Sequence, residues 1–300
     1  MKIILASIIA LLIIACLYLK GYIFVTSNHI SDNAAKLNMN ITDPENEDEI
    51  YVQHIRHATV MVSINSKKIL IDPMISDVNK LPPVPLTSNR LRNPMVPLPV
   101  NISELQHADA ILITHYHFDH FDTEAQKFFP KDIQIFCQPA DENKLRKHGF
   151  KKVTAVEKEF VWENLLFGRF DANHGTGLLG KIMGNSSSFL ISNGKKSVFI
   201  SGDALYDKAL RKTLNDCKPD IIVANAGEAR MLFGKPITMN TEDIVSIADT
   251  LPYANIITVH MDAINHCGLT RNNLREYLKK RNMLDRIAIP EDGETLRFAH

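Results

Sequence analysis

A dense cluster of candidate metal ligands follows one short apolar stretch, and it limits more than any other feature what this chain can fold into. Residues Ala110–Thr114 have the length and composition of a buried β-strand. Directly after them come His115, His117, Asp119 and His120. Side chains alternate along extended backbone, so His115 and His117 point the same way and can bind one ion. Asp119 and His120 can bind a second ion, and the cluster therefore favours a two-metal site at a strand end.

The alternative for this cluster is a solvated polar loop without metal. Adjacent ionisable groups at a strand end would then lack an obvious purpose, because buried histidines need partners. Further ligands have to come from elsewhere in the chain, since a catalytic zinc ion takes several protein donors and keeps one position open.

Three later strand-like segments are each followed by a single histidine or aspartate. His174 follows Leu166–Ala172, Asp203 follows Val198–Ile200, and His260 follows Asn255–Val259. Taken singly, each is more often structural, because an aspartate in a Gly-Asp turn commonly bonds its own backbone. Together they supply the carboxylate and the histidines that the first cluster lacks, so we expect all three in the site.

The rest of the chain alternates strands, polar loops and helices, which indicates one α/β domain. We expect a β-hairpin from Thr59–Ile64 and Lys68–Ile71. The clearest further strands are Ala110–Thr114, Ile133–Cys137, Ser197–Ser201, Asp220–Ala224 and Asn255–Val259. Helices are expected after Asn240 and after Thr270, whose hydroxyl can cap the helix. Six of the fourteen prolines lie between Pro82 and Pro99, which predicts a long loop.

Composition excludes several classes of protein. The chain has 300 residues, of which 45% are hydrophobic and 23% charged, as in an ordinary globular protein. Lys plus Arg and Asp plus Glu both number 34, so no net charge attracts nucleic acid, and we expect no nucleic-acid partner. The four cysteines are too widely spaced for a disulfide framework or a paired-cysteine zinc ribbon.

An apolar segment at the N-terminus predicts a single membrane-spanning helix. Residues 3–19 carry no charge, and a helix of this length rises about 26 Å, close to the hydrocarbon thickness if Lys20 snorkels. The alternatives are a lipoprotein signal with Cys16 as the lipidated residue, or an ordinary cleaved signal. Lys2 and Lys20 flank the segment on both sides, so the positive-inside rule gives only a mild preference for an extracytoplasmic domain.

The predicted domain organisation follows from these features. Residues 1–26 form the transmembrane anchor or signal, and residues 27–49, which are polar and without apolar periodicity, form a linker. Residues 50–300 form one enzyme domain, so the protein is expected at a membrane with a single N-terminal span.

The combined ligand set resembles the metallo-β-lactamase superfamily. The residues that carry the resemblance are His115, His117, Asp119, His120, His174, Asp203 and His260. This resemblance covers residues 50–300 and implies an α/β fold, an αββα sandwich with the dinuclear site at one edge. It also implies that His115, His117 and His174 bind the first ion. Asp119, His120 and His260 would bind the second, and Asp203 would bridge the two.

Flanking motifs are similar to one branch of the superfamily, which holds ascorbate-6-phosphate lactonase and N-acylphosphatidylethanolamine-hydrolysing phospholipase D. They include the segment His57-Ala58-Thr59-Val60, the Asp72-Pro73 turn, the segment Asn225-Ala226-Gly227 and the run from His260 to Cys267. The branch implies a hydrolase that uses a metal-bound hydroxide on an ester, lactone or phosphodiester bond. The substrate is expected to be a small or lipid-like molecule.

A protein acid is needed where the leaving group is poor, and Asp119, His266 and His57 are the candidate donors. His57 could instead support a ligand, and His266 could instead hold its own loop. We expect Cys267 to pack in the core. Arg230, Lys235 and the proline-rich loop could bind the substrate, although a surface role is as plausible for Arg230.

Two other functions remain open from the sequence. One is a metal-dependent oxidoreductase of the same fold, and the other is a catalytically silent metal-binding module. Three imidazoles on one ion suit zinc, so two divalent ions, zinc above all, are the expected cofactors. Manganese and iron stay open because carboxylates also bind them.

Overall fold

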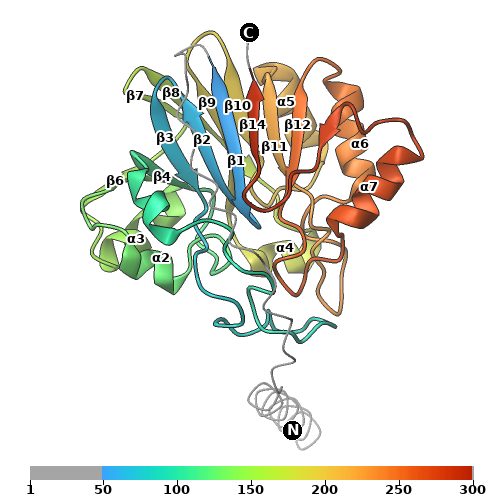
Figure 1. Ribbon diagram of the computed structural model, residues 1–300, viewed down its shortest axis with the longest axis horizontal. Coiled ribbons are helices and arrows are strands. Elements are labelled where there is room, and N and C mark those ends of the chain that lie inside the picture. Colours follow the sequence, from blue (N-terminus) through green and yellow to red (C-terminus); the bar gives the residue numbers. More distant parts are fainter. Residues whose placement is uncertain (1–48, 299–300) are drawn as a thin grey trace, which may run out of the picture.

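The computed structural model describes residues 49–298, which form two β-sheets of seven strands each, packed face to face (Figure 1). The first sheet has the order β14 (Thr295–Phe298), β1 (Ile50–Arg56), β2 (Thr59–Ile64), β3 (Lys67–Ile71), β4 (Ala110–Ile113), β5 (Gln134–Cys137) and β6 (Lys152–Ala155). The second has the order β13 (Ile287–Ala288), β12 (Asn255–Val259), β11 (Ile221–Asn225), β10 (Ser197–Ile200), β9 (Ser186–Ser192), β8 (Leu165–Ala172) and β7 (Glu159–Trp162).

Helices cover the outer face of each sheet (Figure 1). Beside the first sheet lie η1 (Ile102–His107), α2 (Thr123–Phe128), η2 (Pro139–Asp141) and α3 (Glu142–Lys147). Beside the second lie α5 (Lys208–Cys217), α6 (Thr241–Thr250) and α7 (Arg271–Lys279). A further helix, α4 (Gly177–Met183), lies across one end of the sandwich. This arrangement is the expected αββα sandwich.

Three apolar layers hold the sandwich together. Between the sheets, side chains from both inner faces interlock, among them Val62, Ile69 and Phe136 from the first sheet and Phe167 and Ile257 from the second. There are two further apolar layers, one between each sheet and the helices that cover it. Strands buried on both faces need nearly continuous apolar sequence, which is why the central strands stand out as uninterrupted apolar runs.

Most of the expected elements form within one residue of their predicted bounds. β12 begins and ends at the predicted residues, and the hairpin of β2 and β3 ends at Ile71 as expected. α6 begins after Asn240 with a capping box, and α7 begins after Thr270, whose side chain accepts from Asn273 N–H. Across residues 82–99 there is no helix or strand, only an isolated bridge partner at Asn93.

Among residues 49–298 no helix is long and apolar enough to cross a bilayer. The predicted anchor, residues 1–26, and the linker as far as residue 48 lie outside the described residues. That prediction therefore stays untested by the structure.

The strand directions bring the carboxyl ends of several strands to one edge of the sandwich. β3, β4 and β5 run parallel, and β1 runs in the same direction because it is separated from β3 by the antiparallel β2. In the second sheet β10, β11 and β12 run parallel, and β8 shares their direction across the antiparallel β9. Segments far apart in sequence therefore meet where these strands end, and every predicted ligand lies there.

Candidate metal centre

The candidate ligands come together at the carboxyl ends of β4, β8, β10 and β12. His115 to His120 follow β4, His174 follows β8, Asp203 follows β10 and His260 follows β12. His57, which follows β1, joins them from the first sheet. The two sheets thus contribute side chains to one cluster, although the residues are up to 203 positions apart.

Three histidines form the first half of the cluster. Ring nitrogens of His115, His117 and His174 lie within 4.8 Å of one another. His115 and His174 are buried, whereas His117 is partly exposed. His117 Nδ1 lies 2.9 Å from His115 Nε2, and His117 Nε2 lies 3.0 Å from the carbonyl of Met183, the last residue of α4.

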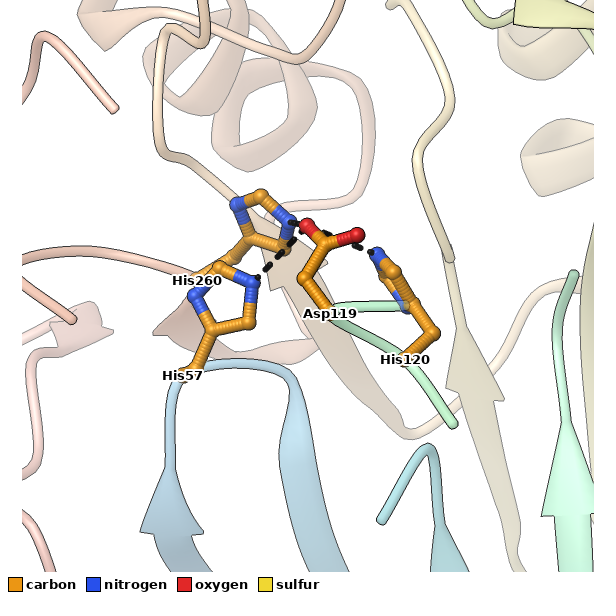
Figure 2. A group of neighbouring side chains, drawn as sticks. All are labelled: His57, Asp119, His120 and His260. Carbon is orange, nitrogen blue, oxygen red and sulfur yellow. Dashed lines mark hydrogen bonds and ion pairs between the residues drawn. The ribbon is translucent and has the colours of Figure 1, made fainter. Parts of the chain in front are cut away.

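Three histidines and one carboxylate form the second half, shown in Figure 2. Asp119 Oδ2 lies 3.3 Å from His57 Nε2 and 3.8 Å from both His120 Nε2 and His260 Nε2. The imidazoles of His57 and His260 pack on one another, with centroids 3.8 Å apart. All four side chains are buried.

Asp203 lies between the two halves. Its Oδ2 atom is 3.5 Å from His174 Nε2, 4.0 Å from His115 Nε2 and 3.3 Å from His120 Nε2. Its Oδ1 atom is 3.2 Å from His260 Nε2 and accepts from Asn225 Nδ2 at 2.8 Å. A single carboxylate therefore faces histidines of both halves, which is the geometry that a bridging ligand requires.

Each of these histidines is oriented by a bond to its other ring nitrogen. His120 Nδ1 lies 2.8 Å from Asp72 Oδ2, and His174 Nδ1 lies 2.9 Å from the Ile237 carbonyl. His115 Nδ1 lies 3.1 Å from Thr114 Oγ1, and His260 Nδ1 lies 3.5 Å from the sulfur of Cys267. Such outer contacts set the ring orientation and the tautomer of metal-binding histidines.

Asp72 organises the loop that follows β4. Its Oδ1 accepts from the Thr114 backbone N–H at 2.7 Å, and its Oδ2 accepts from the Thr114 hydroxyl at 2.6 Å in addition to facing His120. The sequence marked Asp72 only as part of a turn, because nothing local indicates a partner 42 or 48 residues away. Asn225, which bonds Asp203, was noted as a motif but without a role.

Burial and mutual charge set the protonation of the cluster. Burial, with His120 and His117 nearby, holds the pKa of His115 well below its ordinary value, and burial likewise lowers the pKa of His174. Both imidazoles are therefore neutral near pH 7, which is the form that binds metal.

The two carboxylates are held ionised. Burial opposes ionisation of Asp203, yet His260 and His120 hold its pKa well below its ordinary value. Burial also opposes ionisation of Asp119, whose pKa is held low by His120 and His57. Two buried negative charges in one cluster require positive charge beside them.

An independent observation indicates that these residues fit divalent metal ions. His120 Nε2 and His260 Nε2 are buried and have no hydrogen-bond partner of suitable geometry, although both face Asp203 and Asp119. Burying an unsatisfied ring nitrogen is costly, so two such atoms within one group of candidate ligands point to an ion that satisfies them. Imidazole and carboxylate donors together suit zinc, and they also bind manganese or iron.

The predicted proton donors lie in different positions. Asp119 is within the cluster, and His57 contacts it through Nε2. Burial holds the pKa of His57 well below its ordinary value, and the nearby His260 lowers it further. His57 is therefore neutral, and in this form it orients Asp119. His266 is outside the ligand groups, with its ring centroid 6.2 Å from that of His260. Burial lowers the pKa of His266 to about 4, so near pH 7 it is neutral and offers one ring N–H.

Three further predicted residues lie near the cluster. Cys267 contacts His260 Nδ1 through its sulfur, so it does more than pack. Arg230 is exposed and bonds Glu228, which is the surface role left open by the sequence. Lys235 is exposed on the loop that precedes Ile237.

Two hollows open beside the cluster, on either side of the end of α4. The larger, about 670 Å³, is lined by His174, Gly175, Lys181 and Asn185 among others. The smaller, about 290 Å³, is lined by polar side chains of Tyr116, His117, Gln138 and Lys144 and by Met183. A substrate entering either hollow meets one of the three histidines of the first half.

Comparison with known proteins agrees with this fold and site. The model of the β-lactamase superfamily domain matches residues 67–261, more than half of the chain. The chain therefore belongs to this family, whose fold is the metallo-β-lactamase fold described above. The predicted relation to the lactonase and phospholipase branch is not resolved by this match.

Individual relatives match more than four fifths of the chain. The UPF0173 protein YddR of Bacillus subtilis (strain 168) is 34% identical over 252 residues, which are 82% of this chain and 99% of that protein. An isothiocyanate hydrolase from Delia radicum gut bacteria is 35% identical with a TM-score of 0.80, and the match covers 83% of this chain and 100% of the other. A possible metal-dependent hydrolase from Veillonella parvula DSM 2008 is 32% identical with a TM-score of 0.80, covering 82% and 98%.

Proposed function

We propose that this protein is a metal-dependent hydrolase whose reaction takes place at the cluster around Asp203. The observation that carries the proposal is the pair of buried nitrogens His120 Nε2 and His260 Nε2, which face ionised carboxylates but form no hydrogen bond of suitable geometry. Ligand nitrogens held without a partner are costly in a folded protein unless a ligand is their purpose. The similarity to two proteins described as hydrolases supports the same function.

The ligand assignment follows the two halves of the cluster. His115, His117 and His174 would hold one ion, Asp119, His120 and His260 would hold the second, and Asp203 would face both. When bound, divalent ions supply a polarising charge for the substrate and lower the pKa of water.

The protein's own residues provide the rest of the chemistry. His57 fixes the Asp119 carboxylate through Nε2, and Asp72 fixes the His120 ring through Nδ1. Asp119 Oδ2, set among His57, His120 and His260, is placed to accept a proton at the site and to pass it to the leaving group. The end of α4 and the loop to Ile237 shield the cluster from bulk water through their bonds to His117 and His174.

Two observations bear on the class of substrate. Sequence motifs favour an ester, lactone or phosphodiester, whereas a relative 35% identical is an isothiocyanate hydrolase. All of these substrates have an electrophilic carbon or phosphorus that water attacks, so one site geometry serves each of them. We propose an electrophile with a polar end, since both hollows present polar side chains beside His117 and His174.

The test combines metal analysis with a substrate panel. Purified full-length chain should contain two equivalents of divalent metal and hydrolyse at least one of an aryl isothiocyanate, a lactone, a phosphodiester and a phospholipid. Chelation should abolish that activity, and re-addition of metal should restore it. Asp203→Ala and His115→Ala should lose both metal and turnover while keeping the circular dichroism of the folded chain. Asp216→Ala, an exposed residue of α5, serves as the matched control and should behave as wild type.

Other outcomes would identify the alternatives. Iron with redox activity and no hydrolysis would favour the oxidoreductase, and bound metal without turnover of any kind would favour the silent module. Wild-type turnover by Asp203→Ala would refute the site assignment.

A further inference from the structure

Exposed apolar side chains gather on three neighbouring segments beside the metal cluster. Eleven large apolar residues are exposed among residues 49–298, and six of them lie on these segments. One of the six is Leu91, and we name the other five the docking face: Leu86, Leu178, Ile182, Leu232 and Phe233. Each is between 44% and 74% exposed. Apolar side chains grouped in this way, rather than scattered singly, mark an interaction surface.

The three segments are physically connected. Leu232 N–H donates to the Leu86 carbonyl at 2.7 Å, which joins the loop after β11 to the proline-rich loop. Gly234 packs so closely on Leu179 of α4 that an added Cβ would lie 2.9 Å from that side chain. Leu178 and Ile182 are four residues apart in α4, so they share its outer side while Leu179 points inward.

The same segments line the metal cluster. Met183 at the end of α4 bonds His117, and Ile237, just after the Leu232 loop, bonds His174. Asn265, which precedes the predicted donor His266, bonds the proline-rich loop at Val84 and Asn89. In Figure 1, α4 and the proline-rich loop lie at the same end of the sandwich. Whatever covers the docking face therefore lies against the entrance to the site.

The charge of these segments indicates an anionic partner. Residues 77–100, 173–186 and 228–240 hold six Lys and Arg but only two acidic residues, a net charge of +4 in a chain that is neutral overall. Lys181 and Lys235 are exposed beside the apolar residues, and neither forms an ion pair within the described residues. Apolar side chains bordered by basic ones are typical of surfaces that bind anionic bilayers.

The sequence outside the described residues agrees with a bilayer as the partner. The uncharged stretch 3–19 is long enough to enter a membrane, and 22 residues of the predicted linker, 27–48, precede the described fold. β1 begins at the end of the sandwich opposite the site, since Ile50 pairs with Phe298 whereas His57 lies in the cluster. Extended, the linker reaches about 75 Å, whereas β1 spans about 23 Å. The linker therefore allows the far end of the sandwich, where the docking face lies, to turn toward the same membrane.

The size of the docking face also favours a tethered bilayer over a second copy of the chain. Five side chains of this size and exposure offer on the order of 500 Å², which is below the roughly 800 Å² per partner of a stable protein interface. A tether removes that requirement, because it raises the effective concentration of the surface to which the face binds.

We propose that the docking face rests on an anionic lipid bilayer and that the metal cluster opens toward it. An amphiphilic substrate would then reach the cluster directly from the lipid. The inference concerns where the domain sits, and it does not depend on the hydrolytic activity proposed above.

The test places a tryptophan on the docking face of the full-length chain in vesicles. Phe233→Trp and Leu178→Trp report on the face, and Tyr253→Trp is the matched control. Tyr253 is 55% exposed and precedes β12, at the end opposite the site. Vesicles of phosphatidylcholine and phosphatidylglycerol contain brominated or unbrominated acyl chains, and the native Trp162 gives the common background.

We expect brominated lipid to quench the introduced tryptophan in Phe233→Trp and in Leu178→Trp but to leave that in Tyr253→Trp unchanged. Replacing Lys181 and Lys235 by Gln should weaken docking about fivefold per residue on anionic vesicles. It should have no effect on pure phosphatidylcholine. Lys212→Gln with Lys279→Gln, on α5 and α7, should leave docking unchanged.

Several outcomes would overturn the proposal. Equal quenching at all three positions would mean that the domain has no preferred face toward the lipid. Vesicle flotation without quenching at positions 178 and 233 would mean that the face points away. Shielding of these positions that depends on protein concentration and not on lipid would identify a second copy as the partner. Failure to float with vesicles would exclude a lipid partner altogether.

Discussion

At the scale of single residues, Asp72 explains how the cluster holds its shape. It is not among the candidate ligands, yet it bonds the Thr114 backbone, the Thr114 hydroxyl and His120 from one buried carboxylate. One side chain thus fixes both the start of the ligand loop and the orientation of a ligand ring. Outer contacts of this kind strongly influence metal affinity, because they hold the ligands in their binding geometry.

We therefore predict that Asp72→Asn weakens metal binding about 10- to 100-fold. The amide keeps one acceptor, but it loses the charge that stabilises His120 as a hydrogen-bond donor. Competitive titration with a fluorescent chelator measures the affinity. Unchanged affinity in Asp72→Asn would mean that Asp72 only holds the backbone.

Asp220 supplies a matched control for this prediction. Its Oδ2 accepts from Ser197 N–H at 2.8 Å and from the Ser197 hydroxyl at 3.1 Å, so it binds the backbone and the hydroxyl of one residue, as Asp72 does with Thr114. It lies at the opposite end of the strands, however, where β10 and β11 begin. Asp220→Asn should lower the free energy of unfolding by about 1 kcal/mol and leave metal affinity unchanged.

Cys267 has a contact that the sequence did not predict. The sequence predicted only packing in the core, but the Cys267 sulfur lies 3.5 Å from His260 Nδ1. Burial, with Asp119 nearby, raises the pKa of this thiol well above its ordinary value, so it stays a protonated thiol. Sequence spacing could not reveal the contact, because it depends on how the turn after β12 brings residue 267 back toward residue 260.

We predict that Cys267→Ala lowers metal affinity by less than Asp72→Asn, roughly two- to tenfold, because a thiol is a weaker partner than a carboxylate. Cys267→Ser should recover most of that loss, since its hydroxyl can bond the same nitrogen. The same chelator competition measures both variants. Equal affinity of the alanine variant and wild type would return Cys267 to a packing role.

At the scale of elements, the strands that the sequence predicted share one property. β4, β5, β10, β11 and β12 are buried on both faces and appear as short apolar runs between turn residues. β7 was missed because its residues are half-buried or exposed, and β13 because it has only two residues. α4 escaped prediction because glycines stand at its first and fourth positions, where they weaken helix propensity.

The predictable part of the candidate site also depended on these buried strands. Ligands directly after predicted strands were found, since parallel strands end at a common edge. The contacts that depend on two loops meeting, such as Met183 with His117 and Asn225 with Asp203, have no signal in local sequence. They arise only from the packing of the two sheets.

The turn after β11 gives a prediction at this scale. Gly227 packs against the segment that follows β12 so closely that an added Cβ would lie 2.8 Å from His260 Nδ1 and 2.9 Å from Cys267 Sγ. Gly227→Ala should therefore displace His260 and cost about 1–3 kcal/mol of unfolding free energy. Metal content should fall below two equivalents. Chemical denaturation and elemental analysis measure the two effects.

Gly168 in β8 is the matched glycine for that experiment. Its nearest neighbour to an added Cβ is the Phe170 ring at 3.5 Å, an ordinary contact, and its backbone is not in the left-handed region. Gly168→Ala should keep both the stability and the metal content of wild type. Loss of metal in Gly168→Ala as well would show that the effect at Gly227 is general destabilisation rather than displacement of His260.

At the scale of the whole molecule, the uncharged N-terminal stretch predicts how the protein is held at a membrane. Residues 3–19 lack any charge, and each lysine placed at the centre of such a segment costs about 2.5–3.5 kcal/mol of insertion free energy. We expect the full-length chain to stay in the membrane fraction after alkaline carbonate extraction. Leu11→Lys with Leu12→Lys should release it, because two such charges exceed what the remaining apolar residues offset.

A Cys16→Ser variant distinguishes the three interpretations of the N-terminal stretch. With a transmembrane anchor, Cys16→Ser stays membrane-bound and the mass of the mature chain includes residue 1. With lipoprotein processing, Cys16→Ser loses attachment and the wild-type chain begins at a modified Cys16. With an ordinary signal, the wild-type chain is shortened and soluble. Mass spectrometry of the extracted chain distinguishes these results. The first two leave the linker joined to a membrane anchor, as the proposed orientation of the docking face requires, whereas the third removes the tether.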